Sequence, residues 1–219
     1  MVFGTSLTLA LIEVRPGGDV RSVLAYSGTG GLLLILLGLV WTAGDHRHRT
    51  IVATALAAPR RPSPFAAQML ALAVVGVLVG LAAGAFTVAI TVAWLGVEGV
   101  PLGVSGGVIA VAVAGGALYS GLAAALGGGL GALTRNQVAA AIVLFLYLSS
   151  VDPLLAMAVP DYGQFGPTAL GIALSGGAET PGGPGMQLLP IGAAAAVWAG
   201  YAAVLIATGL AVTVRRDLR

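Results

Sequence analysis

Long apolar stretches, separated by short polar segments, cover most of the chain. An α-helix needs about 20 apolar residues to cross the hydrocarbon core of a bilayer, and five stretches approach or exceed that length. The pattern predicts an all-α fold, a polytopic transmembrane helical bundle in which residues 1–219 form a single domain. The five expected spans are residues 27–44, 65–95, 103–133, 137–159 and 188–214.

The first residues are apolar over only about half the length of a span. Residues 1–12 are bounded by Glu13 and Arg15, and they lack the basic start and small-residue cleavage site of a signal peptide. Two interpretations stay open: a short helix at the membrane interface, or the end of a first helix that begins before this chain. The following loop, with Asp19 and Arg21, is placed outside by parity.

Residues 160–187 follow the fourth span and are rich in glycine and proline. They nevertheless contain a short apolar piece at 168–174. Non-regular backbone is tolerated at membrane depth where protein or water buries it. We therefore expect an outer loop that is either re-entrant or lies on the surface.

The sign of the few charged residues predicts the orientation. Arginines are retained on the cytoplasmic side of a membrane. They gather in 45–64, at Arg135 and in 215–219, which share one face if the spans alternate. We expect that face and the C-terminus in the cytoplasm. The intervening loops are acidic and expected outside, with Glu98 in one and Asp152, Asp161 and Glu179 in the other.

Composition supports the membrane assignment and excludes several functions. The chain is 58% hydrophobic and 8% charged, whereas about 25% of the residues of a soluble domain are charged. Every basic residue is Arg, and a chain without Lys cannot form a Walker A phosphate-binding loop. The absence of Cys excludes disulfides, thiolate catalysis and Cys-based metal sites. The scattered arginines form no nucleic-acid footprint.

Segment 45–64 is the most polar of the expected inner segments. Asp45 stands where a helix N-cap would, and residues 50–58 favour a helix that Pro59 ends. This predicts a short amphipathic helix along the cytoplasmic interface, either an anchor for lipid phosphates or a docking site for another protein. We expect no metal site at His46 and His48. Residues two apart on a helix point in different directions, and no third His is present.

Two ridges of small residues run along the second and third expected spans. Small residues four apart lie on one helix face and let helix backbones approach closely in lipid. The run 127–131, which holds four glycines, also predicts a softened inner end of the third span. The ridges are Gly76, Gly80 and Gly84 in one span, and Gly116, Ser120, Ala124 and Gly128 in the other.

Candidate catalytic chemistry is sparse. Gly103-Val104-Ser105-Gly106 matches the GxSG pattern of rhomboid proteases. Such a serine needs a histidine base, but both histidines belong to the opposite face. We expect no enzyme activity from this chain and no catalytic residues. Weakly polar side chains within the spans are candidates for a substrate path: Tyr119, Tyr147, Ser149 and Ser150.

Four stretches, in their order and spacing, resemble the membrane permeases of type-2 ABC exporters in their compact bacterial six-helix form. They are DHRHRTIVATALAAPRR, GLGALTRNQVAAAIV, VDPLL and GYAAVLIATGLAVTVRRD. The chain departs from the family where Asp45 replaces the usual Glu and Arg49 stands where Gly is common. The resemblance favours the interpretation of 1–12 as the end of a truncated first helix.

The resemblance implies a transport subunit in the plasma (inner) membrane of a bacterium, where it works with partners. Segment 45–58 would be a coupling helix that docks on a separate ATP-binding cassette ATPase, which holds ATP and Mg²⁺, while this chain binds no cofactor. A second permease would complete a homodimer or heterodimer, moving an amphipathic or lipid-like substrate (drug, antibiotic or lipid intermediate) out of the cell. The alternative is a non-transporting scaffold or regulatory subunit in the membrane. The implied ATPase contacts are Asp45, His46, Arg47, His48, Arg49, Thr50 and Arg135.

Overall fold

The computed structural model describes residues 18–27, 30–47, 62–99, 101–134, 136–177 and 188–216. All regular elements in this part of the chain are helical. In chain order they are α2 (Gly18–Ser27), α3 (Gly31–Arg47), α5 (Pro62–Glu98), α6 (Gly106–Leu133), α7 (Gln137–Leu146), the π-helical turn η2 (Tyr147–Val151), α8 (Asp152–Ala158), α9 (Pro160–Gly163), α10 (Pro167–Leu174) and α11 (Ile191–Arg216).

Four of the expected spans are helices that are long and apolar enough to cross a membrane. They cover Pro64–Val97, Gly106–Leu133, Gln137–Ala158 and Ile191–Thr213. The remaining expected span, 27–44, corresponds to α3, whose apolar part, Gly31–Gly44, is shorter than the other four. The prediction of an all-α membrane bundle is confirmed in this coarser form.

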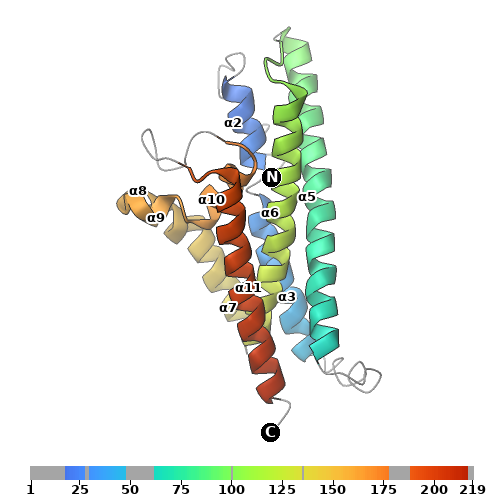
Figure 1. The fold of residues 1–219 in the computed structure, drawn as a ribbon, viewed down its shortest axis with the longest axis vertical. Coiled ribbons are helices and arrows are strands. Elements are labelled where there is room, and N and C mark those ends of the chain that lie inside the picture. The colour runs from blue at the N-terminus through green and yellow to red at the C-terminus, as the bar shows by residue number, and fades with distance from the viewer. Residues whose placement is uncertain are drawn as a thin grey trace.

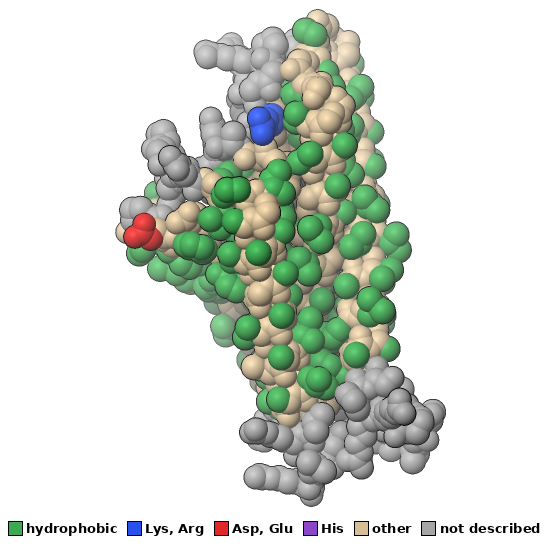
Figure 2. All heavy atoms as spheres, in the orientation of Figure 1, with side chains coloured by type: hydrophobic (Ala, Val, Ile, Leu, Met, Phe, Trp, Pro, Cys, Tyr) green, Lys and Arg blue, Asp and Glu red, His purple; other side chains and the backbone are tan. Residues whose placement is uncertain are grey.

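Alternating helix directions bring five helix ends together at one end of the bundle. In Figure 1, α3, α6 and α11 finish at the lower end, where α5 and α7 begin. The expected basic segments adjoin these ends, since Arg47 closes α3 and Arg216 closes α11. On the face shown in Figure 2, hydrophobic side chains are distributed along the length of the bundle and few charged ones appear among the described residues. Which end faces the cytoplasm stays a prediction.

Helix α6 lies at the centre of the bundle because glycine lets three neighbours approach its backbone. Three successive residues each point about 100° from the last around an α-helix. A Cβ on Gly127 would overlap the carbonyl of Ile35 in α3, and one on Gly128 would lie 2.7 Å from Leu72 Cδ1 in α5. A Cβ on Gly129 would lie 2.7 Å from the Leu205 carbonyl carbon in α11. The run expected to soften this helix therefore packs it against three others.

The close helix packing expected of the small-residue ridges is confirmed, and the structure shows that the two ridges pack against each other. A Cβ on Gly76 of α5 would lie 2.5 Å from the carbonyl oxygen of Ser120 in α6. A Cβ on Gly80 would lie 2.7 Å from Ala117 Cα. Both distances are too short for a side chain, so only glycine permits this spacing of α5 and α6.

Helix α2 corrects the expectation of a loop between the N-terminal segment and the first full span. Val20 and Leu24 are buried and form a cluster with Leu95 of α5 and Ala112 of α6. The apolar residues of this stretch are thus packed, and Arg21 lies on the exposed side. In Figure 1, α2 lies at the upper end of the bundle, opposite the end where α3 finishes, and the assignment of this segment to the outside stays a prediction.

Helix α3 also extends further than the sequence indicated. It continues through Asp45 to Arg47, so Asp45 lies in its last turn. The prediction that Asp45 is the N-cap of a new helix is therefore wrong. The amphipathic helix expected over 50–58 lies outside the described residues, as does the segment 1–12.

The apolar piece at 168–174 becomes α10, which packs inside the bundle. Six of its eight residues, 169–174, are buried, and α10 contacts α2, α6 and α11. Figure 1 shows it beside the upper part of α11. The surface-loop alternative is therefore wrong, and the re-entrant alternative stays a prediction.

The fourth span is interrupted where Pro153 enters it. Proline lacks an N–H, and its ring excludes the carbonyl four residues earlier, here that of Ser149. The helix widens into η2 immediately before, and the Asp152 N–H bonds to the carbonyl of Tyr147, five residues back. A π-turn of this kind accommodates the proline without ending the span.

Candidate functional site

Asp152 is the charged side chain that the bundle buries. The structure describes three charged side chains, of which Arg21 and Asp161 are exposed whereas Asp152 is 1% exposed. The sequence analysis assigned Asp152 to an acidic outer loop, and that assignment is wrong. A carboxyl group inside a membrane helix is costly to bury unless donors surround it, and it commonly marks a functional region.

Three donors converge on the Asp152 carboxylate. The Tyr162 hydroxyl of α9 donates to Oδ1 over 2.9 Å. The Thr168 hydroxyl donates to Oδ2 over 2.7 Å, and the Thr168 backbone N–H donates to the same oxygen over 3.3 Å. Hydrogen bonds to an ionised acceptor are stronger than neutral ones, so this residue ties α8, α9 and α10 together.

The backbone around Gly166 lets Asp152 reach α10. A Cβ on Gly166 would lie 2.6 Å from Asp152 Oδ1, so a larger residue would displace the carboxylate. Gly166 precedes the first turn of α10, which begins at Pro167. The free N–H groups at a helix start favour a negative charge, and the carboxylate occupies that position.

Tyr162 extends the network from Asp152 to Tyr147. The two tyrosine hydroxyl oxygens lie 2.7 Å apart. Burial raises the pKa of the Tyr162 phenol above its ordinary value, and the hydrogen bonds with Tyr147 and Asp152 raise it further. Tyr162 therefore remains a protonated donor at neutral pH.

An apolar cavity with an aromatic side lies next to this network, between α3, α6, α7, α9 and α11. Its volume is about 330 Å³, within the range of about 300–1,000 Å³ that is typical of small-molecule sites. We call it the tyrosine cavity. Thirteen of the described residues line it: Ile35, Leu126, Leu130, Leu144, Tyr147, Leu148, Tyr162, Phe165, Pro167, Trp198, Tyr201, Val204 and Leu205.

Aromatic contacts fix the α11 side of the cavity. The ring of Trp198 stacks on Tyr119 with centroids 4.8 Å apart and planes at 17°, and it meets Tyr201 edge-on at 6.1 Å. Trp198 Nε1 donates to the Tyr119 carbonyl over 3.2 Å. The Tyr201 hydroxyl donates to the Phe165 carbonyl over a long 3.4 Å. Packing and hydrogen bonds thus hold this wall in place.

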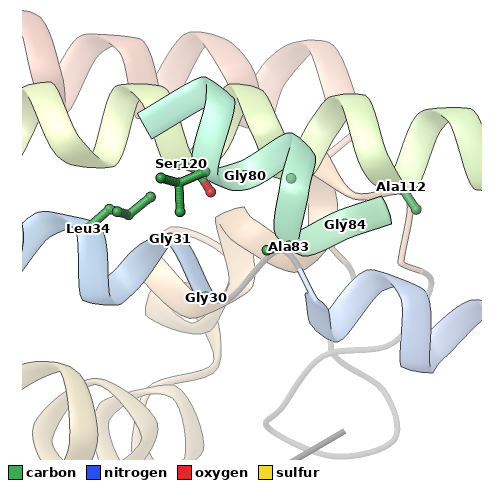
Figure 3. Close-up of a pocket in the computed structure, with 10 residues that line it drawn as sticks. Gly30, Gly31, Leu34, Gly80, Ala83, Gly84, Ala112 and Ser120 are labelled. Carbon is green, nitrogen blue, oxygen red and sulfur yellow. The ribbon is translucent and has the colours of Figure 1, made fainter. Parts of the chain in front are cut away.

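A second, smaller cavity lies between α3, α5 and α6. Figure 3 shows Gly30, Gly31 and Leu34 facing Gly80 and Gly84 of α5. Its volume is about 40 Å³, and Ser120 is the polar side chain among the ten residues that line it. Half of these residues are glycine, so this space belongs to the small-residue packing of the bundle.

The four candidate residues of the substrate path fall in different environments. Tyr147 lines the tyrosine cavity. Tyr119 is fully buried behind Trp198, and its hydroxyl donates to the Pro167 carbonyl over 2.9 Å. Ser149 and Ser150 are exposed, with their hydroxyl oxygens 3.5 Å apart. The structure therefore brings only Tyr147 of the four to the cavity wall.

The residues implied as ATPase contacts lie mostly beyond the described part of the chain. Asp45, His46 and Arg47 form the last turn of α3, at the end of the bundle where α11 finishes. His48, Arg49, Thr50 and Arg135 lie outside the described residues. Their role as a docking surface stays a prediction.

Sequence reasoning missed Asp152, Tyr162, Thr168, Trp198 and Tyr201. One signal was present: Asp152-Pro153 falls inside the apolar stretch 137–159, and an acidic residue within a span points to a polar site. Trp198 and Tyr201 are three apart and so share one helix face. Nothing in the sequence connects these residues to Tyr162 or Thr168.

No protein-family model matches this chain, and neither curated proteins nor solved structures provide a match. The described residues form an all-helical bundle in which four helices are long and apolar enough to cross a membrane. The hydrogen bonds of the buried Asp152 reach the wall of the tyrosine cavity through Tyr162 and Tyr147.

Proposed function

We propose that this chain is the membrane-spanning permease subunit of an ATP-driven exporter, and that the tyrosine cavity receives its amphipathic substrate. The observation that carries the proposal is this cavity of about 330 Å³ inside an apolar bundle, with apolar walls and tyrosines on one side. An apolar cavity with a few polar groups is the usual form of a small-molecule site.

The ATPase partner is supported by the sequence. The stretch DHRHRTIVATALAAPRR resembles the coupling segment of type-2 ABC exporter permeases. With its C-terminus in the cytoplasm, the chain presents this segment to a separate ATPase. When the ATPases close on ATP, they bind one conformation of the bundle more tightly than the other. This difference in affinity shifts the bundle between two access states.

Co-purification with a candidate ATP-binding cassette ATPase tests the proposal. The tagged chain is co-expressed with the ATPase as wild type, as Arg47→Glu and as Arg216→Glu. Both changes reverse a charge at the same end of the bundle, but only Arg47 belongs to the coupling segment. We expect the wild type and Arg216→Glu to retain the ATPase and Arg47→Glu to release it while still eluting as folded protein.

Two results would overturn the proposal. The first is that no ATPase from several candidates is retained by the wild type. The second is that all three forms retain the ATPase equally, which would remove the coupling segment from the interface. Either result favours a non-transporting scaffold or regulatory subunit.

A further inference from the structure

The polar groups on the wall of the tyrosine cavity have a fixed hydrogen-bonding direction. Tyr162 has one O–H, and it donates to Asp152 Oδ1. Tyr147 must therefore be the donor in the 2.7 Å bond between the two hydroxyls. The single proton of Tyr147 is thus used within the protein, and its oxygen retains only acceptor lone pairs.

The other side-chain donors of the cavity are also used. Trp198 Nε1 donates to the Tyr119 carbonyl, and the Tyr201 hydroxyl donates to the Phe165 carbonyl. The nine remaining residues of the described lining are apolar, so their side chains supply no donor and no positive charge. The wall therefore offers a ligand acceptor oxygens and aromatic faces.

Asp152 polarises the hydrogen bonds that end at Tyr147. Its carboxylate lies at the end of the chain of hydrogen bonds that runs through Tyr162 to Tyr147. Hydrogen bonds in series polarise one another in a low-dielectric interior. The negative charge increases the acceptor strength of the Tyr147 oxygen, and the aromatic faces attract cations.

We infer that the tyrosine cavity selects amphiphiles whose head group donates hydrogen bonds and carries positive charge, such as a primary ammonium, over those with an anionic head. An anionic phosphate or carboxylate needs donors, and the side chains of this wall have none free. This inference names the substrate class of the proposed exporter and rests on that proposal for its physiological meaning. The binding preference itself belongs to this chain alone.

Binding of three probes with the same eight-carbon chain tests the preference. The purified chain in phosphatidylcholine nanodiscs, without any ATPase, is titrated with octylammonium, octyltrimethylammonium and octanoate, and binding to empty nanodiscs is subtracted. We expect octylammonium to bind at least about tenfold more tightly than octanoate, the effect of one hydrogen bond to a charged group. Equal or tighter binding of octanoate, or no binding of any probe, overturns the inference.

Two variants locate the preference on the tyrosine pair. Tyr147→Phe keeps the aromatic face but removes the acceptor, so octylammonium should lose about tenfold in affinity. Octyltrimethylammonium, which has no N–H, should change less than about twofold. An equal loss for both ammonium probes, or none for either, contradicts the assigned role of Tyr147.

Tyr162→Phe distinguishes a role of Tyr162 in ligand preference from a purely structural role. It removes the acceptor of the Tyr147 proton, so the Tyr147 hydroxyl becomes free to donate into the cavity. The preference for octylammonium over octanoate should shrink by at least about threefold, through improved binding of octanoate. An unchanged ratio counts against the inference.

The two proposals fail separately. Loss of ATPase co-purification with an intact probe preference rejects only the exporter proposal. Retained co-purification without the probe preference rejects only the substrate class.

Discussion

Helix α6 and the span formed by α7, η2 and α8 both have the length to cross a membrane, but they are built in opposite ways. Half (50%) of the most apolar stretch of α6 is buried inside the protein, against 11% for the other span. Helix α6 presents glycine and alanine to its neighbours. The other span exposes large side chains such as Val143 and Leu146 and yet holds the buried Asp152.

The difference reflects what stabilises a bundle in lipid. Lipid tails are as apolar as leucine, so burying a large apolar side chain gains little, and helices associate by close backbone packing. Small residues therefore form most of the buried face of α6, whereas α7 exposes large side chains. Asp152 is buried for another reason: α9 and α10 fold back and surround its carboxylate with donors.

The largest effect is expected from adding a side chain to the centre of α6. Gly127→Leu would force apart α3 and α6, because even a Cβ there overlaps the Ile35 carbonyl. We expect a loss of at least about 3 kcal/mol of stability, seen as loss of the monodisperse peak in size-exclusion chromatography. The control, Gly200→Leu in α11, has no atom within 4 Å of its Cβ position. Equal profiles for both variants would contradict the close packing of α6.

The next largest effect concerns the buried carboxylate. Asp152→Ala leaves the Tyr162 and Thr168 donors without their acceptor, at about 2–3 kcal/mol of stability. Asp161→Ala, which removes the same group from an exposed position nine residues later, should change stability by less than about 0.5 kcal/mol. Thermal unfolding of both variants measures the contrast, and a similar shift for the two would show that the network does not stabilise α8–α10.

Tyr119→Phe should have a moderate effect on stability. The change removes the 2.9 Å hydrogen bond to the Pro167 carbonyl but retains the stack on Trp198, at about 1 kcal/mol. Tyr201→Phe removes only a 3.4 Å bond from a side chain that is 40% exposed and should be nearly neutral. A larger loss for Tyr201→Phe in thermal unfolding would reverse the ranking of these contacts.

The smallest effect is expected on the exposed face of α7. Val143 is 66% exposed, so Val143→Ala should alter stability by less than about 0.5 kcal/mol. Leu148→Ala, from the buried core cluster, should lose about 2–5 kcal/mol as a matched truncation. Destabilisation by Val143→Ala comparable to that of Leu148→Ala would indicate that another chain, rather than lipid, covers α7.

Much of the fold was predictable because it depends on local composition. The second to fifth expected spans agree with helices to within a few residues, since a long apolar stretch has few alternatives to a helix in a membrane. The spacing of Gly76, Gly80 and Gly84 indicated close helix packing, and the structure shows that α6 is the partner. The candidate site was predicted poorly: Tyr147 lies on the cavity wall, but Tyr119 packs behind it, and Ser149 and Ser150 face outward.

The sequence by itself determined that this is a membrane bundle of apolar helices, because hydrophobicity and small-residue spacing are properties of each segment. Only the tertiary structure decided that Asp152 is buried and that Tyr147 is hydrogen-bonded to Tyr162. Those properties depend on Tyr162 and Thr168, which the return of α9 and α10 brings against α8. A hydrogen-bond network is a relation between distant segments, and no pattern along one of them specifies its partners.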